Sequence, residues 1–567
     1  MHRMTPRAER LWAAGLLTLH LVLALWGAAR NSVTFDENFH LPAGVVEVAR
    51  RRFDVSPVNP PLLKAACGAI ALAAGARLPT DSAIALREQS VVGESFMRRN
   101  ADRYQRVFFA ARCLVIALSL LLGLLVWRFG RRLHGPRGGL LALAFYALAP
   151  EALAHAGLVT MDLATGLGFF ACVYAWWAFA RSGRWGWWLM AAAALAFAFL
   201  VRFSAALLFP FLLVVGGLLQ HAGRVKSRRR LWLGYAALAL VVPLALDAGY
   251  LGQVSFRPLR ERTVLSGAFR RLQTAAPNLR LPLPDDWLTG MDVQSAESNE
   301  GDTPTFVLGR ITNQPVRWYF PFALAIKWPL GFWGALIAAG LLVARAKRRA
   351  SDAWTLRIVP LGFLFSAAFL VNLNVGIRYV FPILPFLCTA CGALADPRRM
   401  RPAPARVARR WLVAGILLAA VQGIETAWTA PWYLSSFNLL AGGPGGGYRL
   451  INDSNVDWGQ GLLDLKDVMR RHGIERIHLC YHGSTDPAIY GIESIPFRGG
   501  HLGPESEWLG VSSYFFVGQT QRMMTPTGFT PFMTADFSRL WGLRPAAVAG
   551  RSIYLYHLPE VLGAASP

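Results

Sequence analysis

The sequence predicts a mainly α-helical, polytopic membrane protein of about 11 transmembrane helices, followed by a small extracytoplasmic α/β domain. The chain is 54% hydrophobic and only 16% charged, whereas soluble domains carry about 25% charged residues. Apolar runs recur over residues 1–430 and approach the roughly 20 residues that cross a bilayer. Basic residues gather in alternate loops between these runs. Composition, run length and charge pattern therefore indicate the same class of protein.

Each predicted transmembrane helix corresponds to one apolar run. The runs lie near residues 11–29, 107–127, 138–154, 160–180, 185–201, 204–220, 231–250, 317–343, 357–372, 377–395 and 411–430. The first run is longer than the apolar region of a usual signal peptide and is read as a helix. Segment 61–79 is also apolar, but it begins with two prolines and contains Lys64 and Arg77. We expect an interfacial or re-entrant helix there.

The formal charge of +25 could suggest nucleic-acid binding, but its distribution indicates membrane topology instead. With eleven spans, all of the basic clusters fall on one side. They are Arg3/Arg7/Arg10, Arg128/Arg131/Arg132/Arg137, Arg181/Arg184, Lys226/Arg228/Arg229/Arg230, Arg345/Lys347/Arg348/Arg349 and Arg398/Arg399/Arg401/Arg406/Arg409/Arg410. Positive loops stay in the cytoplasm. The N-terminus is therefore predicted inside and the C-terminus outside, with no nucleic-acid partner.

This topology assigns the remaining regions of the chain. Loops 30–106 and 251–316 of the transmembrane domain (1–430) face outward, as does everything after it. Residues 431–447 are rich in glycine and predict a flexible linker. Residues 448–567 predict an α/β domain. Its expected elements are a helix over Gly459–His472 and strands over Arg476–Tyr481, Ser512–Val517 and Ser552–Leu558.

The six cysteines do not suggest a disulfide scaffold, because four of them fall within predicted spans. Cys388 and Cys391 are spaced as a C-x-x-C pair in the tenth span. No candidate ligands lie near them in the sequence, so we interpret the pair as a packing feature rather than a metal or redox site.

Two adjacent carboxylates, Asp36 and Glu37, lie just beyond the first apolar run. Acids at the edge of the hydrocarbon lose hydration and tend to persist where they face water, a cation or a reacting group. A carboxylate can take the proton from an attacking hydroxyl, and Arg or Lys can neutralise a departing phosphate. An outer loop with these groups, beside a lipid-accessible surface, has the components for group transfer from a lipid phosphate.

Several sequence patches resemble a known family. They are Phe35-Asp36-Glu37 with Phe39-His40, Asn59-Pro60-Pro61-Leu62, Met161-Asp162-Leu163-Ala164, Phe306-Val307-Leu308-Gly309, Tyr319-Phe320-Pro321, Lys327-Trp328-Pro329-Leu330, Arg378-Tyr379-Val380-Phe381-Pro382 and Asp457-Trp458-Gly459-Gln460-Gly461-Leu462. Their order resembles glycosyltransferase family 39, with its protein O-mannosyltransferases and the aminoarabinose-transferase-like enzymes. These are membrane glycosyltransferases of the C-type superfamily. The last patch is similar to a tail found in bacterial members, and abundant Ala, Arg, Gly and Pro agree with a bacterial origin.

The resemblance implies a polyprenyl-phosphate sugar as donor and an inverting displacement at the bacterial cytoplasmic (inner) membrane. Asp36 would be the base, and Glu37 would orient the acceptor or hold a cation. Both acids could instead cap the following helix. Phe39-His40 follow the acid pair where aminoarabinose transferases carry Arg-Tyr. The large insertion of eukaryotic protein mannosyltransferases is missing, so protein, glycolipid and glycan acceptors all stay open.

The remaining candidates sit at outer helix ends. Asp162 would be a further catalytic acid or a helix-terminal charge. The predicted substrate-binding residues are His40, Lys64, Arg202, Lys327, Arg378, Tyr379, Asp457 and Trp458. Among them, Arg202 and Arg378 are favoured as phosphate ligands, whereas Lys327 could equally be a snorkelling anchor and Trp458 a core residue beside a turn.

No cofactor is assigned. A divalent cation could bind the carboxylates of the first outer loop, but no ligand spacing matches an established metal motif. A transporter or lipid flippase is the alternative function, since it would also place charges in the membrane region. The sequence shows no duplicated halves of the kind common in transporters, and the candidate charges collect at the outer face.

Overall fold

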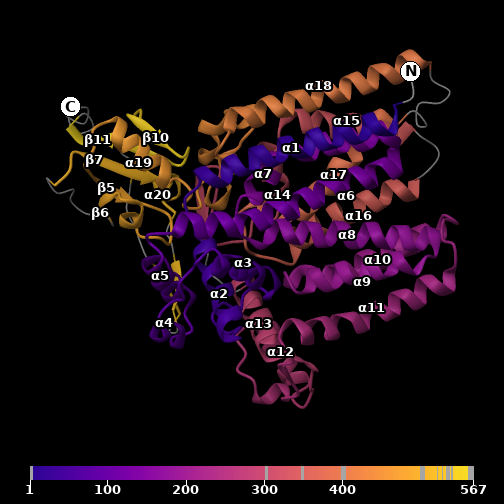
Figure 1. Cartoon of the computed structure of the whole chain (residues 1–567), viewed down its shortest axis with the longest axis horizontal. Coiled ribbons are helices and arrows are strands. Elements are labelled where there is room, and N and C mark those ends of the chain that lie inside the picture. Colours follow the sequence, from indigo (N-terminus) through magenta and orange to yellow (C-terminus); the bar gives the residue numbers. More distant parts are fainter. Residues whose placement is uncertain are drawn as a thin grey trace.

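The computed structural model describes residues 4–299, 304–345, 350–396, 404–497, 505–519, 522–525, 528–531, 537 and 540–559. Long helices run side by side, with the N-terminus at one end of the bundle and the C-terminal sheet at the other (Figure 1). Lys347, Arg348 and Arg349, together with Arg398, Arg399 and Arg401, lie outside the described residues.

The helices occur throughout the chain, and the strands lie after residue 250. The helices are α1 Pro6–Arg30, α2 Glu37–Arg50, α3 Leu62–Ala73, α4 Asp81–Ala85, α5 Gln89–Arg99, α6 Tyr104–Ala147, α7 Pro150–Ala156, α8 Met161–Ser182, α9 Trp185–Phe199, α10 Leu208–His221, α11 Arg228–Gly249, α12 Gly267–Ala275, α13 Asp285–Asn299, α14 Tyr319–Lys327, α15 Leu330–Arg345, α16 Ala350–Phe369, α17 Leu384–Cys391, α18 Ala405–Thr429, α19 Leu462–Arg471 and α20 Ser513–Phe516. The strands are β1 Val254–Ser255, β2 Leu283–Pro284, β3 Thr305–Val307, β4 Arg310–Thr312, β5 Arg476–Cys480, β6 Glu493–Pro496, β7 Trp508–Ser512, β8 Arg522–Thr525, β9 Gly528–Pro531, β10 Ala547–Ala549 and β11 Ile553–His557.

Among the described residues, seven helices are long and apolar enough to cross a membrane, or eight when the bent pair α14 and α15 counts as one span. The predicted run 185–201 corresponds to the shorter helix α9, and 357–372 to the shorter apolar segment Trp354–Phe369 of α16. The structure confirms a mainly helical membrane protein. Eleven crossings stay a prediction.

Helix α6 contains the predicted run 107–127 and residues 138–147 of the run 138–154, and it is broken between them at Gly135. The end of the second run lies in α7. Gly135 has a φ of 82°, a conformation that favours glycine, and Pro136 follows it. The two halves pack closely: a Cβ added at Gly130 would lie 3.0 Å from the Cβ of Ala142 and 3.2 Å from the Cα of Gly139. A sharp turn between two apolar segments thus replaces a single long span.

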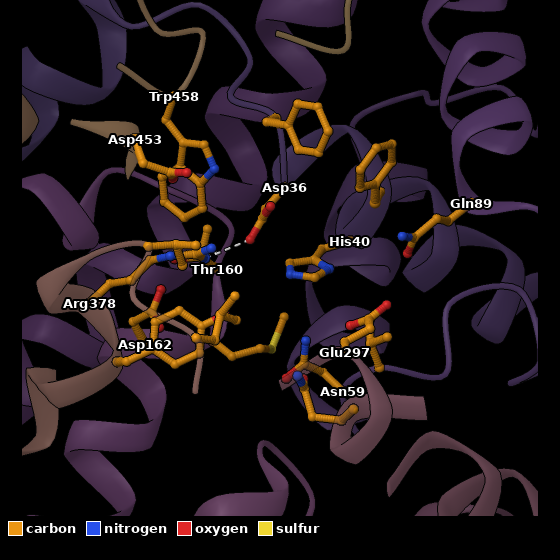
Figure 2. Close-up of a pocket in the computed structure, with 18 of the residues that line it drawn as sticks. Asp36, His40, Asn59, Gln89, Thr160, Asp162, Glu297, Arg378, Asp453 and Trp458 are labelled. Atoms are coloured by element: carbon orange, nitrogen blue, oxygen red, sulfur yellow. Dashed lines mark hydrogen bonds and ion pairs between the residues drawn. The ribbon is translucent and has the colours of Figure 1, made fainter. Parts of the chain in front are cut away.

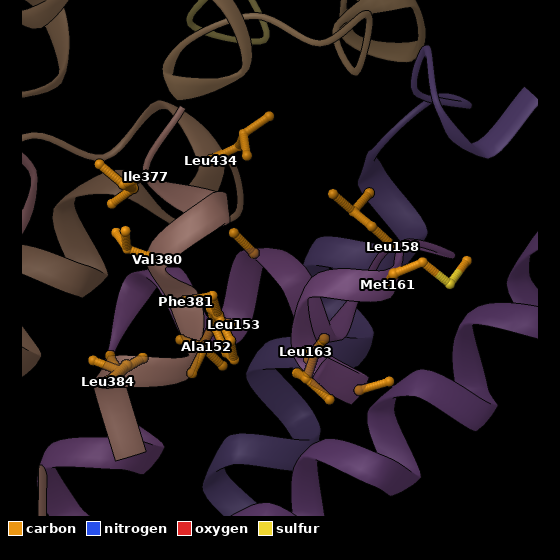
Figure 3. Close-up of a cluster of buried hydrophobic side chains, with 14 of the residues drawn as sticks. Ala152, Leu153, Leu158, Met161, Leu163, Ile377, Val380, Phe381, Leu384 and Leu434 are labelled. Carbon is orange, nitrogen blue, oxygen red and sulfur yellow. The ribbon is translucent and has the colours of Figure 1, made fainter. Parts of the chain in front are cut away.

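A buried apolar cluster fixes the elements that carry the outer charged residues (Figure 3). Leu153 of α7 and Leu163 of α8 lie in it with Val380 and Phe381, which belong to the 3-10 helix Ile377–Ile383 ahead of α17. A Cβ at Gly166 would lie 2.8 Å from the Phe381 ring, so α8 and this segment are in close contact. The starts of α8 and of the 377–383 segment are therefore held rigidly together.

Helices α2 and α3 pack backbone against backbone within residues 30–106. A Cβ built at Gly68 would clash with the backbone of Gly44, and one at Gly44 would clash with the backbone of Lys64. This close approach requires glycine on both helices. The predicted helix within 61–79 is α3, and it packs against α2 and α6.

The C-terminal region contains a five-stranded mixed sheet of order β10-β11-β7-β5-β6. Strand β5 runs parallel to β6 and β7, while β11 is antiparallel to β7 and β10. The predicted helix and the strands at 476–481 and 552–558 are confirmed as α19, β5 and β11.

The predicted strand over Ser512–Val517 is wrong, because β7 ends at Ser512 and Ser513–Phe516 form the short helix α20. Because Ser513–Phe516 are helical, the aromatic side chains of this segment point in different directions. Tyr514 stacks on His482, with ring centroids 3.9 Å apart, while Phe516 packs on Tyr554. Aromatic content favours strands, but here burial on two sides decides the conformation.

Residues 431–447, expected to form a flexible linker, fold instead into successive 3-10 turns. Tyr433, Leu434 and Ser435 are buried, and Asn438 donates from its side-chain amide to the carbonyls of Ala325 and Trp328 at 2.7 and 2.8 Å. The segment therefore packs against the end of α14.

Candidate active site

A cavity of about 300 Å³ lies where loop 30–106, loop 251–316 and the C-terminal region meet. Most of the sequence-predicted site residues line it: Asp36, His40, Asp162, Arg202, Arg378, Tyr379 and Trp458. Figure 2 shows Asp36 between Arg378 on one side and His40 on the other. The structure thus brings together site residues that are up to about 420 positions apart in the sequence, from Asp36 to Trp458.

Asp36 forms an ion pair with Arg378 on the cavity wall. The Arg378 Nη1 donates to the Asp36 Oδ2 at 2.7 Å (Figure 2). The guanidinium lies over the Trp458 ring at 4.1 Å and near the Tyr379 ring at 5.1 Å. Stacking on aromatic faces fixes the orientation of a guanidinium. Arg378 is therefore held in place on the cavity wall, and its Nε has no hydrogen-bond partner among the described residues.

A second ion pair, Asp162 with Arg202, stands beside the first. The Arg202 Nη1 donates to the Asp162 Oδ1 at 2.5 Å. Asp162 lies in the first turn of α8, where the helix dipole favours a negative charge. Arg202 follows the end of α9, and its guanidinium lies 5.0 Å from the centre of the Tyr379 ring. Tyr379 therefore contacts both arginines.

Three polar atoms on the cavity wall are buried without a hydrogen-bond partner among the described residues. They are the Arg378 Nε, the His40 Nδ1 and the Thr160 Oγ1. Leaving buried polar groups unpaired is costly, and such groups commonly mark where a ligand binds. A ligand with several hydroxyls and an anionic group would satisfy all three.

Sequence reasoning missed two acids of this cavity, Glu297 and Asp453. Burial, together with the nearby Asp36 charge, raises the pKa of Glu297 to about 7. Burial raises the pKa of Asp453 to about 6, against the opposing effect of its backbone hydrogen bond with Ser454. Asp453 lies in the polar run Asn452-Asp453-Ser454-Asn455, which offered a signal. Glu297 lies in a polar stretch of loop 251–316 that offered no such signal.

Two histidines face the cavity in their neutral form near pH 7. Burial lowers the pKa of His40 to about 4, although the Asp36 charge opposes this. Burial likewise lowers the pKa of His482 to about 4, against its hydrogen bond with the Asp457 carbonyl. A neutral imidazole can both donate and accept a hydrogen bond, which suits contact with sugar hydroxyls.

One segment of the chain matches a known protein family by its sequence. Residues 104–246 match the family model described as dolichyl-phosphate-mannose-protein mannosyltransferase. A search of curated proteins found no match.

Comparison with solved structures extends over most of the chain. The S. cerevisiae protein O-mannosyltransferase Pmt1-Pmt2 complex bound to the sugar donor has a TM-score of 0.51 at 12% identity, over 87% of this chain and 94% of that chain. The chain has the fold of the C-type membrane glycosyltransferases. The fold that the sequence resemblance predicted is therefore confirmed.

Two further structures with the C-type fold are also similar, at lower scores. ArnT from Cupriavidus metallidurans bound to undecaprenyl phosphate gives a TM-score of 0.45 at 12% identity, over 82% of this chain and 73% of that chain. The archaeal oligosaccharyltransferase AglB from Archaeoglobus fulgidus, in complex with an inhibitory peptide and a dolichol-phosphate, gives 0.44 at 10% identity, over 97% and 77%.

Glu37, the second acid of the predicted pair, does not line the cavity of this C-type fold. Its side chain is fully buried and accepts hydrogen bonds from Arg112 Nε at 2.8 Å and Nη2 at 2.6 Å. It also accepts from the backbone N–H groups of Val159 and Thr34 at 2.9 and 3.0 Å. These contacts fix the start of α2 to α6 and to the turn before α8. Arg112, in the middle of an apolar run, was missed by sequence reasoning.

Lys64 and Lys327 also lie outside the cavity lining and pair with buried acids. The Lys64 Nζ is 2.9 Å from Glu47, and both side chains are about 1% exposed. The Lys327 Nζ is 3.5 Å from Glu151 and donates to the backbone carbonyls of Leu434 and Asn455. Each lysine thus has an acidic partner within the protein.

Asp457, next to the cavity-lining Trp458, is fully buried beneath it. Its carboxylate accepts from the backbone N–H of Gly459 at 3.1 Å. Burial raises the pKa of Asp457 to about 7, partly offset by that hydrogen bond. The structure therefore places Asp457 where it supports the turn that presents Trp458.

The described residues contain no group of three or more His, Cys, Asp or Glu side chains arranged to hold a metal ion. Within the cavity, Asp36 and Asp162 each face an arginine. All six cysteines carry free thiols, and Cys388 and Cys391 are buried in the helical core.

Proposed function

We propose that this protein is a membrane glycosyltransferase that moves a sugar from a polyprenyl-phosphate donor to the hydroxyl of an extracytoplasmic acceptor. The observation that carries the proposal is the Asp36–Arg378 pair on the wall of a cavity with unpaired polar atoms. The C-type fold and the family match over residues 104–246 support the reaction class.

In the proposed reaction, Asp36 is the general base. Its carboxylate takes the proton of the acceptor hydroxyl as that oxygen attacks the anomeric carbon of the sugar. The bond from this carbon to the phosphate oxygen breaks, and its electron pair leaves with the lipid phosphate. Displacement in one step inverts the anomeric configuration. Arg378 and Arg202 stabilise the charge that develops on the phosphate.

The ion pairs explain how the donor would prepare the base. Arg378 and Arg202 each hold one carboxylate in the ligand-free site, at 2.7 and 2.5 Å. An incoming phosphate competes for the same guanidinium groups, which bind oxyanions through several N–H donors. Asp36 then shares or loses its arginine partner and becomes a stronger base. Donor binding would thus activate the base only when the leaving group is in place.

The donor and acceptor are proposed by class. The matching family model is named for dolichyl-phosphate mannose, and the yeast complex is described with its sugar donor. We therefore place a lipid-phosphate hexose or pentose first as donor, with membrane lipids around the bundle. Protein, glycolipid and glycan hydroxyls are the acceptor classes. Glu297 and Asp453 border the cavity and are candidates for orienting them.

We also propose that the protein sits in a bacterial inner membrane with its N-terminus in the cytoplasm and its C-terminus outside. The cavity is lined by residues from loops 30–106 and 251–316 and from the region after 448, all of which this topology assigns to one side. In this proposal residues 1–430 form the transferase domain, and 448–567 form an outer domain that contributes Trp458, His482 and Tyr514 to the cavity wall.

The test uses purified protein in detergent with a panel of radiolabelled polyprenyl-phosphate sugars and membrane extract as acceptor. Wild type should transfer sugar from at least one donor, and Asp36→Asn should lower the rate by about 10²- to 10⁴-fold. Asp81→Asn is the matched control, because Asp81 is 83% exposed in the same outer loop. Equal rates for Asp36→Asn and wild type would show that Asp36 is not the base. If wild type consumes no donor, the proposed glycosyltransferase activity is wrong.

A further inference from the structure

A second large cavity, of about 830 Å³, lies at the end of the bundle opposite the candidate active site. It is bordered by the start of α1, the end of the first half of α6, the C-terminal half of α8 and the start of α9. Figure 1 shows the N-terminus, where α1 begins, at the far end from the C-terminal sheet. The proposed glycosyl transfer uses no residue of this cavity.

The cavity is strongly basic. Four arginines line it, from α1 and α6: Arg10, Arg128, Arg131 and Arg132. Glu9 is the one acid on its wall, and it is paired with Arg131 at 2.9 Å. Arg128 and Arg132 form no ion pair within the part of the chain that the structure describes. The formal charge of the lining is therefore about +3, a field that attracts an anion.

Two aromatic rings hold one of these arginines in position. The Arg132 guanidinium lies 4.3 Å from the centre of the Trp187 ring and 5.2 Å from that of Tyr174. Stacking leaves the N–H edges of a guanidinium available for an oxyanion. Trp127 adds an indole N–H that is buried without an acceptor among the described residues. The cavity thus holds fixed donors as well as charge.

The surface next to the cavity is apolar and exposed. Leu11 and Trp12 of α1 are 65% and 66% exposed, and Leu189 and Met190 of α9 are 62% and 44% exposed. These side chains belong to two apolar helices of the bundle, so a surrounding bilayer would present lipid chains to them. Glu9, Arg10 and Trp187 lie within a few residues of them on the same two helices. A ligand that fits both surfaces has an anionic head and apolar chains.

We propose that this cavity binds the anionic phosphodiester headgroup of a membrane lipid, with its acyl chains along α1 and α9. Basic pockets between transmembrane helices on the cytoplasmic side are suited to such headgroups. A free phosphate would use the arginines but would leave the adjoining apolar surface unused. Since the lining comes from four helical segments, the bound lipid would also tie α1 to α6, α8 and α9.

The test measures lipid binding to the purified full-length chain by native mass spectrometry and by thermal stabilisation. The probes are dioleoyl phosphatidylglycerol, dioleoyl phosphatidylcholine and inorganic phosphate. The variant Arg128→Gln/Arg132→Gln removes the two unpaired charges. The matched control is Arg228→Gln/Arg229→Gln, which removes two exposed arginines from another predicted cytoplasmic cluster.

Wild type should bind phosphatidylglycerol at least tenfold more tightly than phosphatidylcholine. The cavity variant should bind phosphatidylglycerol about tenfold more weakly than wild type does. The control variant should bind it as tightly as wild type. An equal loss of affinity in the control variant would show a general effect of charge, and the proposed binding site would be wrong. If inorganic phosphate stabilises the protein against heat as strongly as phosphatidylglycerol does, the proposal that the ligand is a lipid is wrong. If the double variant does not fold, Arg128→Gln alone gives the same comparison, because Arg128 is exposed and has no ion pair in the described chain.

Discussion

Arg112 binds both carboxylate oxygens of Glu37, at 2.8 and 2.6 Å, and both side chains are buried. The two acids that are adjacent in the sequence therefore have different surroundings. Asp36 faces the cavity, and Glu37 faces the protein interior. Substitution of Asp36 should therefore affect catalysis, and substitution of Glu37 should affect stability.

Glu37→Gln is expected to destabilise the fold. It leaves the buried Arg112 charge uncompensated, and breaking such a pair costs about 3–5 kcal/mol. The measurement is the thermal unfolding midpoint in detergent. Glu94→Gln is the matched control, because the Glu94–Arg98 pair is more than half exposed and such pairs contribute about 0–1 kcal/mol. Equal midpoints for the two variants would contradict the anchoring role of Glu37.

Arg378→Gln is expected to lower kcat/KM for the lipid donor by about 10²- to 10³-fold, because a fixed donor to the departing phosphate is lost. Steady-state transfer assays measure it. Arg317→Gln provides the comparison, since Arg317 is exposed and donates to the Ala368 carbonyl outside the cavity. An unchanged kcat/KM in Arg378→Gln would exclude Arg378 as a phosphate ligand.

The pKa of Glu297 predicts a pH-dependent stability. Burial raises this pKa to about 7 from an ordinary value near 4.5, so ionisation is easier in the unfolded chain. The contribution of Glu297 to stability is therefore lost as the pH rises from about 4.5 through about 7. Glu297→Gln should raise the unfolding midpoint at pH 8 and have little effect at pH 5. A similar change at both pH values would contradict the shift.

Gly68→Ala is expected to separate α2 from α3. A Cβ at this position would clash with the Gly44 backbone, and overpacking typically costs about 1–3 kcal/mol. Gly15→Ala is the control, because a Cβ there meets no atom within 4 Å. The unfolding midpoints should fall for Gly68→Ala and stay constant or rise for Gly15→Ala. A wild-type midpoint in Gly68→Ala would show that the two helices can move apart without cost.

Reporter fusions test the proposed sidedness. A phosphatase reporter, which is active only outside the cytoplasm, should be active after Pro567 and inactive at Met1. A β-galactosidase reporter should show the reverse pattern. Phosphatase activity at Met1 would place the candidate active site in the cytoplasm, and the proposed use of an outward-facing donor would fail.

The transmembrane region could be predicted because its signals are local. Apolar length locates the helices, and the alternating basic loops order them. The site could be predicted in part for the same reason: Asp36, Asp162, Arg202 and Arg378 each stand out as charges at the ends of apolar runs. The predicted topology assigns these residues to one side, and the structure brings them together at one cavity.

The rest depends on contacts between distant segments. Arg112 lies 75 positions from Glu37, and nothing in either local sequence indicates their pairing. Glu297 lies 261 positions from Asp36, and its pKa depends on that proximity and on burial. Lys64 and Lys327 were predicted as substrate contacts from charge alone. Buried partners that sequence reasoning did not anticipate, Glu47 and Glu151, occupy them instead.

The C-terminal residues that border the cavity also impose an order on biosynthesis. The Phe35 N–H donates to the Trp458 carbonyl at 2.8 Å, and the Ser32 N–H to the Gln460 carbonyl at 3.0 Å. Trp458 in turn supports Arg378. A nascent chain would insert most of its helices long before these residues leave the ribosome. In the proposed topology, the newly made protein would therefore lack a complete cavity until its last fifth has been exported and docked.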